Sequence, residues 1–106
     1  MEVLYRSTRG NGSTVTASNA ILKGLSEDGG LFVPDQIPAL EVPMEQLAQM
    51  SYQEVAYEVM SRFLTDFTEK KKKKCIQSAY DQKFDTDVIA PLVKADGAYY
   101  LELFHG

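Results

Sequence analysis

The chain has 106 residues, 44% of them apolar and 25% charged, with a net charge of −4, which is enough for one domain with a modest core. No apolar run is long enough to span a membrane, and the first residues do not resemble a signal peptide. Cys75 is the only cysteine, so an internal disulfide is excluded. These features together predict a cytoplasmic globular protein.

The first third of the chain alternates short strands with one helix. Residues 3–5 are apolar and predict a strand that runs into a polar loop, and the glycines of residues 10–13 continue this loop. Apolar residues at near-helical spacing predict a helix over residues 14–25, with Thr16 or Ser18 as its N-cap. Residues 31–33 predict a brief strand that ends at Pro34.

The middle of the chain is helical. Pro43 suits the first turn of a helix that runs to residue 50. Ser51 and Glu54 have the spacing of a capping box and predict the start of the next helix. That helix has one continuous apolar face, for which we expect burial. The face consists of Val55, Ala56, Val59, Met60, Phe63, Leu64 and Phe67.

A further helix follows, with Thr68 as its expected cap, and it carries five successive lysines, residues 70–74. Five lysines wind around a helix, so at least one stem should lie near the buried side. A nucleic-acid surface needs basic residues spread over a face, and here one local run stands in an acidic chain, so we expect no nucleic-acid partner. Cys75 lies on the apolar side of this helix and is expected in the core.

The last segment predicts a β-hairpin. Two apolar runs, residues 91–95 and 98–104, flank Asp96-Gly97, a pair suited to a tight two-residue turn. The predicted fold is therefore α+β: a small, mostly helical domain over residues 1–106 with short strands near its two ends, the C-terminal hairpin among them.

Few side chains in the sequence point to chemistry. His105 is the only histidine, and one histidine with one cysteine does not supply a His/Cys metal site, so no metal is expected. The glycine-rich residues 10–14 lack the lysine of a P-loop. With Arg6 and Arg9 upstream they could bind an anion, or they could form an ordinary loop before a capped helix.

The chain ends on an apolar strand that runs directly into His105-Gly106. Domain ends are usually polar and frayed. The pattern predicts that the chain is the first part of a longer protein.

Three segments together resemble one family, the threonine synthases of bacteria and fungi. Residues 5–10 (YRSTRG) resemble the family's opening Y-x-S-T-R-G, and residues 28–34 (DGGLFVP) resemble its D-G-G-L-[FY]-V-P. Residues 101–106 (LELFHG) resemble a segment that the family continues as P-T-x-A-F-K-D. The pattern departs at residues 70–74, where the family carries acidic residues and this chain carries lysines.

The resemblance implies the activity of the parent protein: conversion of O-phospho-L-homoserine and water to L-threonine and phosphate, with pyridoxal phosphate (PLP) held on the lysine of F-K-D. That lysine would come six residues after Gly106. We therefore expect residues 1–106 to be the N-terminal domain, without a catalytic residue, without bound cofactor and inactive alone. The expected partners are the catalytic domains of the same chain and, in the parent, the substrate.

The matched motifs also suggest which residues face those domains or the substrate: Ser7, Thr8, Arg9 and His105. Arg9 suits bidentate binding of a phosphate, and an interdomain salt bridge suits it equally well. A different interpretation stays open at this point: a self-contained interaction module without catalysis, which docks through the Phe63–Phe67 helix face or the exposed terminal strand.

Overall fold

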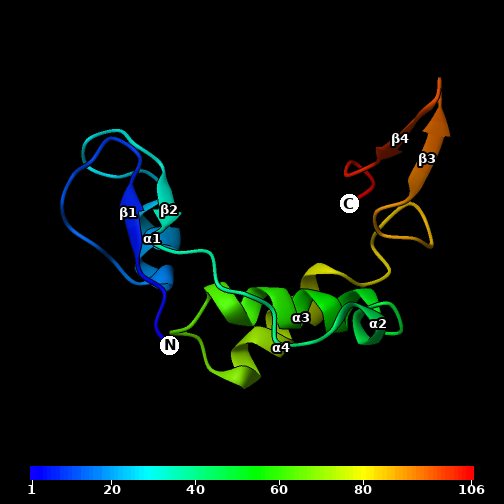
Figure 1. Ribbon diagram of the computed structural model, residues 1–106, viewed down its shortest axis with the longest axis horizontal. Helices are drawn as coiled ribbons and strands as arrows, with labels where there is room; N and C mark the ends of the chain where they lie inside the picture. Colours follow the sequence, from blue (N-terminus) through cyan, green and yellow to red (C-terminus); the bar gives the residue numbers. More distant parts are fainter.

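The computed structural model describes residues 1–106 as two small antiparallel sheets joined by a layer of helices (Figure 1). The predicted α+β class, with short strands near both ends, is confirmed. The elements are β1 (Tyr5–Ser7), α1 (Ala17–Lys23), β2 (Phe32–Pro34), α2 (Met44–Leu47), α3 (Tyr52–Phe63), α4 (Glu69–Ala79), β3 (Leu92–Ala95) and β4 (Ala98–Leu101).

The N-terminal sheet pairs β1 with β2, so that Tyr5 lies opposite Pro34 and Ser7 opposite Phe32. The first strand starts two residues later than residues 3–5 predict. The reason is Val3, which is fully buried and donates its backbone N–H to Thr65 Oγ1 (3.0 Å) instead of to a strand. This bond ties the start of the chain to the end of α3.

Helix α1 is shorter than the predicted 14–25. Thr16 is its N-cap and accepts a hydrogen bond from the Asn19 amide (3.4 Å). Val15 is held extended because it pairs with Tyr5, and the helix ends at Gly24, where φ is +73°. The second candidate cap, Ser18, instead donates its hydroxyl to Asp66.

The other helix starts follow the predicted caps. Ser51 Oγ accepts from the Glu54 amide (3.2 Å), and the Glu54 carboxylate accepts from the Ser51 amide (3.3 Å), so the capping box is confirmed. Thr68 caps α4 by accepting from the Lys71 amide (3.2 Å). Helix α2 is only four residues long, shorter than predicted, and Pro43 is its N-cap. None of the helices combines the length and apolarity needed to cross a bilayer.

The core is small for a chain of this length. Seven of 106 residues are buried, and no residue of α3 is among them. The radius of gyration is 16.3 Å, whereas a compact chain of this size has about 13 Å. The expectation that the apolar face of α3 is buried is therefore wrong within these residues: Val59, for example, is 38% exposed.

Cys75 is likewise exposed, and its predicted place in the core is wrong. It lies on the apolar side of α4 as expected, but nothing in residues 1–106 covers Cys75 itself. Lys72 on the same side is half-buried, as expected for one lysine of the run. The amino groups of Lys72 and Lys73 lie 5.6 and 5.4 Å from the centre of the Tyr57 ring, a cation–π arrangement.

The predicted C-terminal hairpin is confirmed. Strands β3 and β4 pair antiparallel, with Ala95 opposite Ala98, and Asp96 and Gly97 form the connection. Both have positive φ, +50° and +76°, as a type I′ turn requires. All residues of both strands are exposed.

Candidate functional site

The loop that follows β1 is organised around one carboxylate, that of Asp28. Its Oδ1 accepts from Ser7 Oγ (2.6 Å) and from the Gly30 amide (3.0 Å), and its Oδ2 accepts from the Asn11 amide (3.1 Å). We call these four residues the Asp28 cluster. Of the two alternatives for the glycine-rich loop, anion binding and an ordinary loop, the structure thus favours the second, because the Asn11 amide already donates to the Asp28 carboxylate.

The hydrogen bonds of the Asp28 cluster also set its charge. They lower the pKa of Asp28, with the Ser7 hydroxyl as the largest cause and the Gly30 and Asn11 amides as further ones. Asp28 is therefore a stable anion at neutral pH. Ser7 is buried and both donates to Asp28 and accepts from the Arg9 amide (3.1 Å), so its hydroxyl is fully used within the loop.

Thr8 and Arg9 also join the loop after β1 to the segment that contains Asp28. The Thr8 amide donates to the Leu31 carbonyl (2.8 Å), and Thr8 Oγ1 accepts from the Leu31 amide (3.1 Å). Arg9 Nη1 donates to the backbone carbonyl of Asp28 (3.0 Å), and the rest of the exposed guanidinium stays available. Of the three candidate residues here, Arg9 is the one that offers free charged donors at the surface.

The two glycines after Asp28 allow this close approach. A Cβ on Gly30 would lie 2.2 Å from Ser7 Oγ and 3.1 Å from the Arg9 backbone nitrogen, so only glycine fits without displacement. The sequence DGG thus has a local structural reason, which is the packing of two loops that are about twenty residues apart in the chain.

His105 lies in a second cluster at the other end of the molecule. Its Nδ1 is 2.6 Å from Asp85 Oδ1, and its Nε2 is 2.9 Å from Glu102 Oε1. Its backbone carbonyl also accepts from the Asp85 amide (3.1 Å). We call Asp85, Glu102 and His105 the His105 clasp. It fastens the segment after β4 to the loop after α4.

The carboxylates of the clasp favour the charged imidazole. The hydrogen bond with Glu102 is the largest cause that raises the pKa of His105, and Asp85 adds to it. Both ring nitrogens are engaged and the side chain is only 13% exposed. The two carboxylates therefore favour the protonated ring, and both ring nitrogens already have a carboxylate partner.

We expect the His105 clasp to weaken as the pH rises. In the folded chain the pKa of His105 lies above its ordinary value of about 6.5. The contribution of the clasp to folding stability is therefore complete below pH 6.5, and it is lost as the pH rises through the pKa of His105 in the folded chain. Glu102→Gln should move the titration of ¹³C-labelled His105, followed by NMR, to lower pH. Asp87→Asn is the matched control, since Asp87 forms no hydrogen bond with the ring. Identical titrations of the wild type and Glu102→Gln would refute the clasp.

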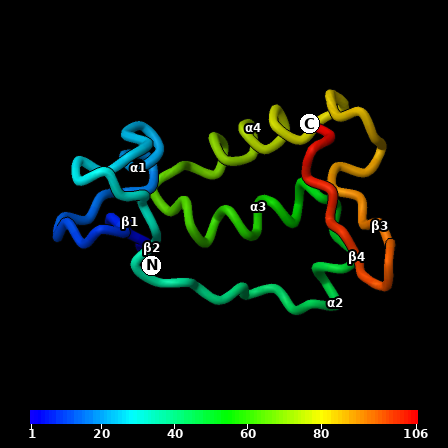
Figure 2. Tube along the Cα trace, turned by 90° about the horizontal axis from the view of Figure 1, so that it is seen from above, coloured from blue at the N-terminus to red at the C-terminus, as the bar shows by residue number.

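The candidate residues do not form one site. Ser7, Thr8 and Arg9 lie together beside β1, whereas His105 lies near the C-terminus, and both views show these segments at opposite ends of the long axis, which measures 42 Å (Figures 1 and 2). No group of His, Cys, Asp or Glu side chains has a metal-binding arrangement.

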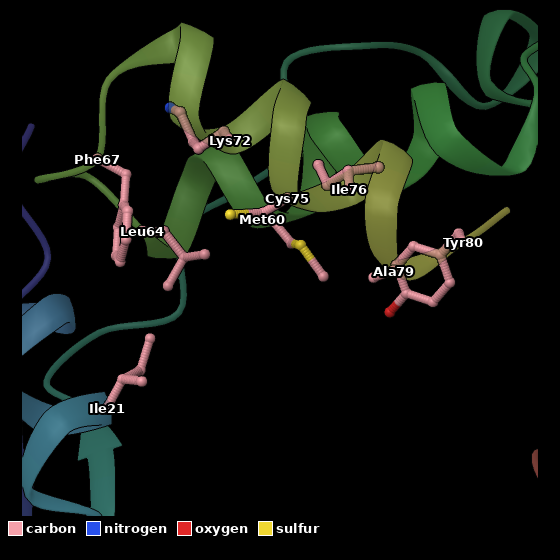
Figure 3. Close-up of a pocket in the computed structure, with 9 residues that line it drawn as sticks. All are labelled: Ile21, Met60, Leu64, Phe67, Lys72, Cys75, Ile76, Ala79 and Tyr80. Carbon is pink, nitrogen blue, oxygen red and sulfur yellow. The ribbon is translucent and has the colours of Figure 1, made fainter. Parts of the chain in front are cut away.

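An open apolar groove lies between α1, α3 and α4 and has a volume of about 310 Å³ (Figure 3). The sequence suggested its helix face, Phe63–Phe67, only as a docking surface in the alternative interpretation. Its apolar periodicity was visible in the sequence, but it was interpreted as buried core. We call this feature the α3–α4 groove. Its walls include Ile21, Met60, Leu64, Cys75, Ile76 and Tyr80.

Comparison with known proteins decides the family. A family model described as "Threonine synthase N terminus" matches residues 4–80. The chain belongs to this family. The threonine synthase of Schizosaccharomyces pombe is 38% identical over 109 residues, which cover 99% of this chain and 21% of that protein. The family resemblance of the sequence motifs is thereby confirmed.

The fold of this chain is also found in solved threonine synthases. The PLP-bound enzyme from Brucella melitensis superposes with a TM-score of 0.78 and 35% identity, over 98% of this chain and 23% of that one. The yeast enzyme gives a TM-score of 0.80 and 32% identity, over 97% and 22%. The chain therefore spans about a fifth of the length of the relatives that it matches.

The lysines of residues 1–106 do not fit PLP. A PLP site needs a lysine for the Schiff base, close to groups that bind the phosphate. The lysines of α4 lie on a helix surface, and the groove that Lys72 borders is otherwise apolar. The lysines outside α4 already contact other side chains: Lys23 with Glu27, Lys83 with Asp81, and Lys94 with the ring of Tyr99.

Proposed function

We propose that this chain is the N-terminal domain, residues 1–106, of a cytoplasmic threonine synthase. The whole enzyme converts O-phospho-L-homoserine and water to L-threonine and phosphate, and its PLP is held by the part of the protein beyond these residues. The observation that carries the proposal is the superposition on the PLP-bound Brucella enzyme over 98% of the chain at 35% identity.

The role of this domain is structural support of the catalytic part. Two features favour that role over catalysis: the exposed apolar surfaces of the α3–α4 groove and of the hairpin, and the engagement of His105 at both ring nitrogens. In this proposal Ser7, Thr8 and Arg9 of the loop after β1, and His105 of the clasp, lie on the sides of the domain that face the remainder of the protein. The domain alone has no activity.

The test is an assay of the longer protein. With PLP and O-phospho-L-homoserine, we expect equal amounts of phosphate and threonine, together with the visible absorbance of a lysine Schiff base. Residues 1–106 alone should give neither. A longer protein that binds PLP but releases no phosphate would refute the proposed substrate. A protein that binds no PLP would favour the interaction module.

Arg9→Ala separates a role in the loop from a role at the substrate. In our proposal Arg9 acts within the loop, through its bond to the Asp28 carbonyl, so we expect KM for O-phospho-L-homoserine to change less than about threefold. Arg6→Ala is the control, since Arg6 is also an exposed arginine of this end of the chain. Loss of a charge-assisted bond to the substrate phosphate would raise KM by roughly tenfold or more in Arg9→Ala alone, and that result would place Arg9 at the substrate.

A further inference from the structure

Arg9 has no acidic partner within residues 1–106. Its Nη1 donates to the backbone carbonyl of Asp28 (3.0 Å), and a carbonyl oxygen carries no net charge. The ion pairs of the chain form instead at Lys23, Arg62, Lys83 and His105. Arg9 is therefore an exposed, permanently charged guanidinium without a counter-ion, although the chain has 15 acidic residues and 11 basic ones.

The backbone beneath Arg9 holds the guanidinium in place. A Cβ on Gly29 would lie 2.6 Å from Arg9 Nη1 and 3.4 Å from Arg9 Cζ, so the guanidinium lies directly against the bare Cα of Gly29. Gly29 has a φ of +84°, a conformation that glycine adopts without strain. The guanidinium thus rests on one residue and bonds to the carbonyl of the residue before it. This bond uses Nη1 and leaves Nε and Nη2 for a bidentate pair.

The carboxylate of Asp28 does not neutralise Arg9, because it is turned to other donors. Its two oxygens accept from Ser7, Gly30 and Asn11 within the Asp28 cluster. Asp28 thus offers its carbonyl to the guanidinium and its carboxylate to the loop. Because the carboxylate belongs to the same residue as this carbonyl, its negative charge repels any anion that approaches Arg9, and it repels a doubly charged anion more strongly. A carboxylate therefore suits this guanidinium better than a phosphate dianion.

We propose that Arg9 is a preformed receptor for one carboxylate, which belongs to the part of the longer protein beyond residue 106. This inference rests on the proposed function, because it requires the longer protein, and it names the chemical group that Arg9 binds there. An oriented guanidinium loses little side-chain entropy when it forms two parallel N–H···O bonds with a carboxylate. Such a partner leaves the substrate phosphate to other residues, in agreement with the small change in KM expected for Arg9→Ala.

The surroundings of Arg9 favour a carboxylate of the same protein over a free anion. Arg9 lines none of the principal cavities of the domain, so a small anion would find no walls around it. An exposed pair of this kind is weak, and a free anion binds it poorly. A carboxylate on the same chain has a high effective concentration and needs no pocket. The relatives provide room for one, since this chain covers only 21% and 23% of two of them.

Carbodiimide cross-linking of Arg9→Lys identifies the carboxylate. The lysine keeps the positive charge, and the reagent condenses its amine with a neighbouring carboxylate to an amide, with loss of water. In the longer protein with PLP bound, we expect peptide mass spectrometry to find position 9 joined to an Asp or Glu beyond residue 106. Arg6→Lys is the matched control, because Arg6 is also exposed but nothing orients its guanidinium. It should give at least about tenfold less of such a cross-link.

The wild-type protein gives a second measurement, because phenylglyoxal modifies free guanidinium groups. In phosphate-free buffer, we expect Arg9 of the longer protein to react at least about tenfold more slowly than Arg6, after correction by the rates in denaturant. Equal rates at the two arginines would overturn the inference. Protection of Arg9 that appears only with added inorganic phosphate would also overturn it, and would show a free anion as the ligand.

The cross-links decide the remaining alternatives. A cross-link from position 9 that joins two copies, or that stays within residues 1–106, would contradict the proposal. Slow modification of Arg9 without any cross-link beyond residue 106 would also contradict it, since Arg9 would then be covered but unpaired. Threonine formation is measured on the same samples. A protein that shows the expected cross-link but forms no threonine refutes the proposed activity and not the receptor.

Discussion

Replacement of Gly30 by alanine is expected to open the junction between the β1 loop and the DGG turn. The new Cβ would lie 2.2 Å from Ser7 Oγ and 3.1 Å from the Arg9 backbone nitrogen, and the latter cannot rotate away. Overpacking of this kind costs about 1–3 kcal/mol, and the loss of the Ser7–Asp28 bond adds to it because the Ser7 hydroxyl is buried. We expect a decrease of about 3 kcal/mol in the free energy of local opening.

Hydrogen exchange measures this effect directly. The Thr8 amide, which donates to Leu31, should exchange roughly 150-fold faster in Gly30→Ala. Gly12→Ala is the matched control in the same loop, since a Cβ there has no atom within 4 Å and Gly12 has no positive φ. Similar exchange in both variants would mean that the close approach at Gly30 does not hold the loops together.

Local chemistry made the helix starts predictable. Ser51 with Glu54, and Thr68 alone, act on amides within three residues, so their geometry follows from spacing. The same holds for Asp96-Gly97, whose positive φ angles are a property of two adjacent residues. The sequence therefore predicts the elements of the fold well where their cause is local.

Contacts between distant residues were not predictable. Ser7 and Asp28 are 21 residues apart, and nothing in either segment indicates that the Asp28 carboxylate would accept hydrogen bonds from the loop that contains Ser7. The motifs marked both segments, but as a resemblance and not as a contact. For the same reason the sequence grouped His105 with Ser7, Thr8 and Arg9, although the fold separates them.

Burial was the property that the sequence predicted least well. Periodicity places the apolar residues of α3 and α4 on one side, and the structure confirms that side. Periodicity does not tell whether the covering surface lies within the same 106 residues. Cys75 and Val59 lie on that apolar side and are nevertheless exposed.

Ile76, in contrast, is buried. Among the helix residues, its truncation should cause the largest decrease in stability. It is 4% exposed and is the only buried residue of α4. Removing a buried isoleucine side chain to alanine costs about 2–5 kcal/mol, because the transfer energy is lost and a cavity remains. At about 3 kcal/mol, the amides of α4 should exchange roughly 150-fold faster in Ile76→Ala.

Lys74→Ala is the matched control for this variant, since it changes an exposed residue on the opposite side of α4 and should stay within about 0.5 kcal/mol of the wild type. Equal exchange in the two variants would contradict the packing of α4 on α3 through Ile76.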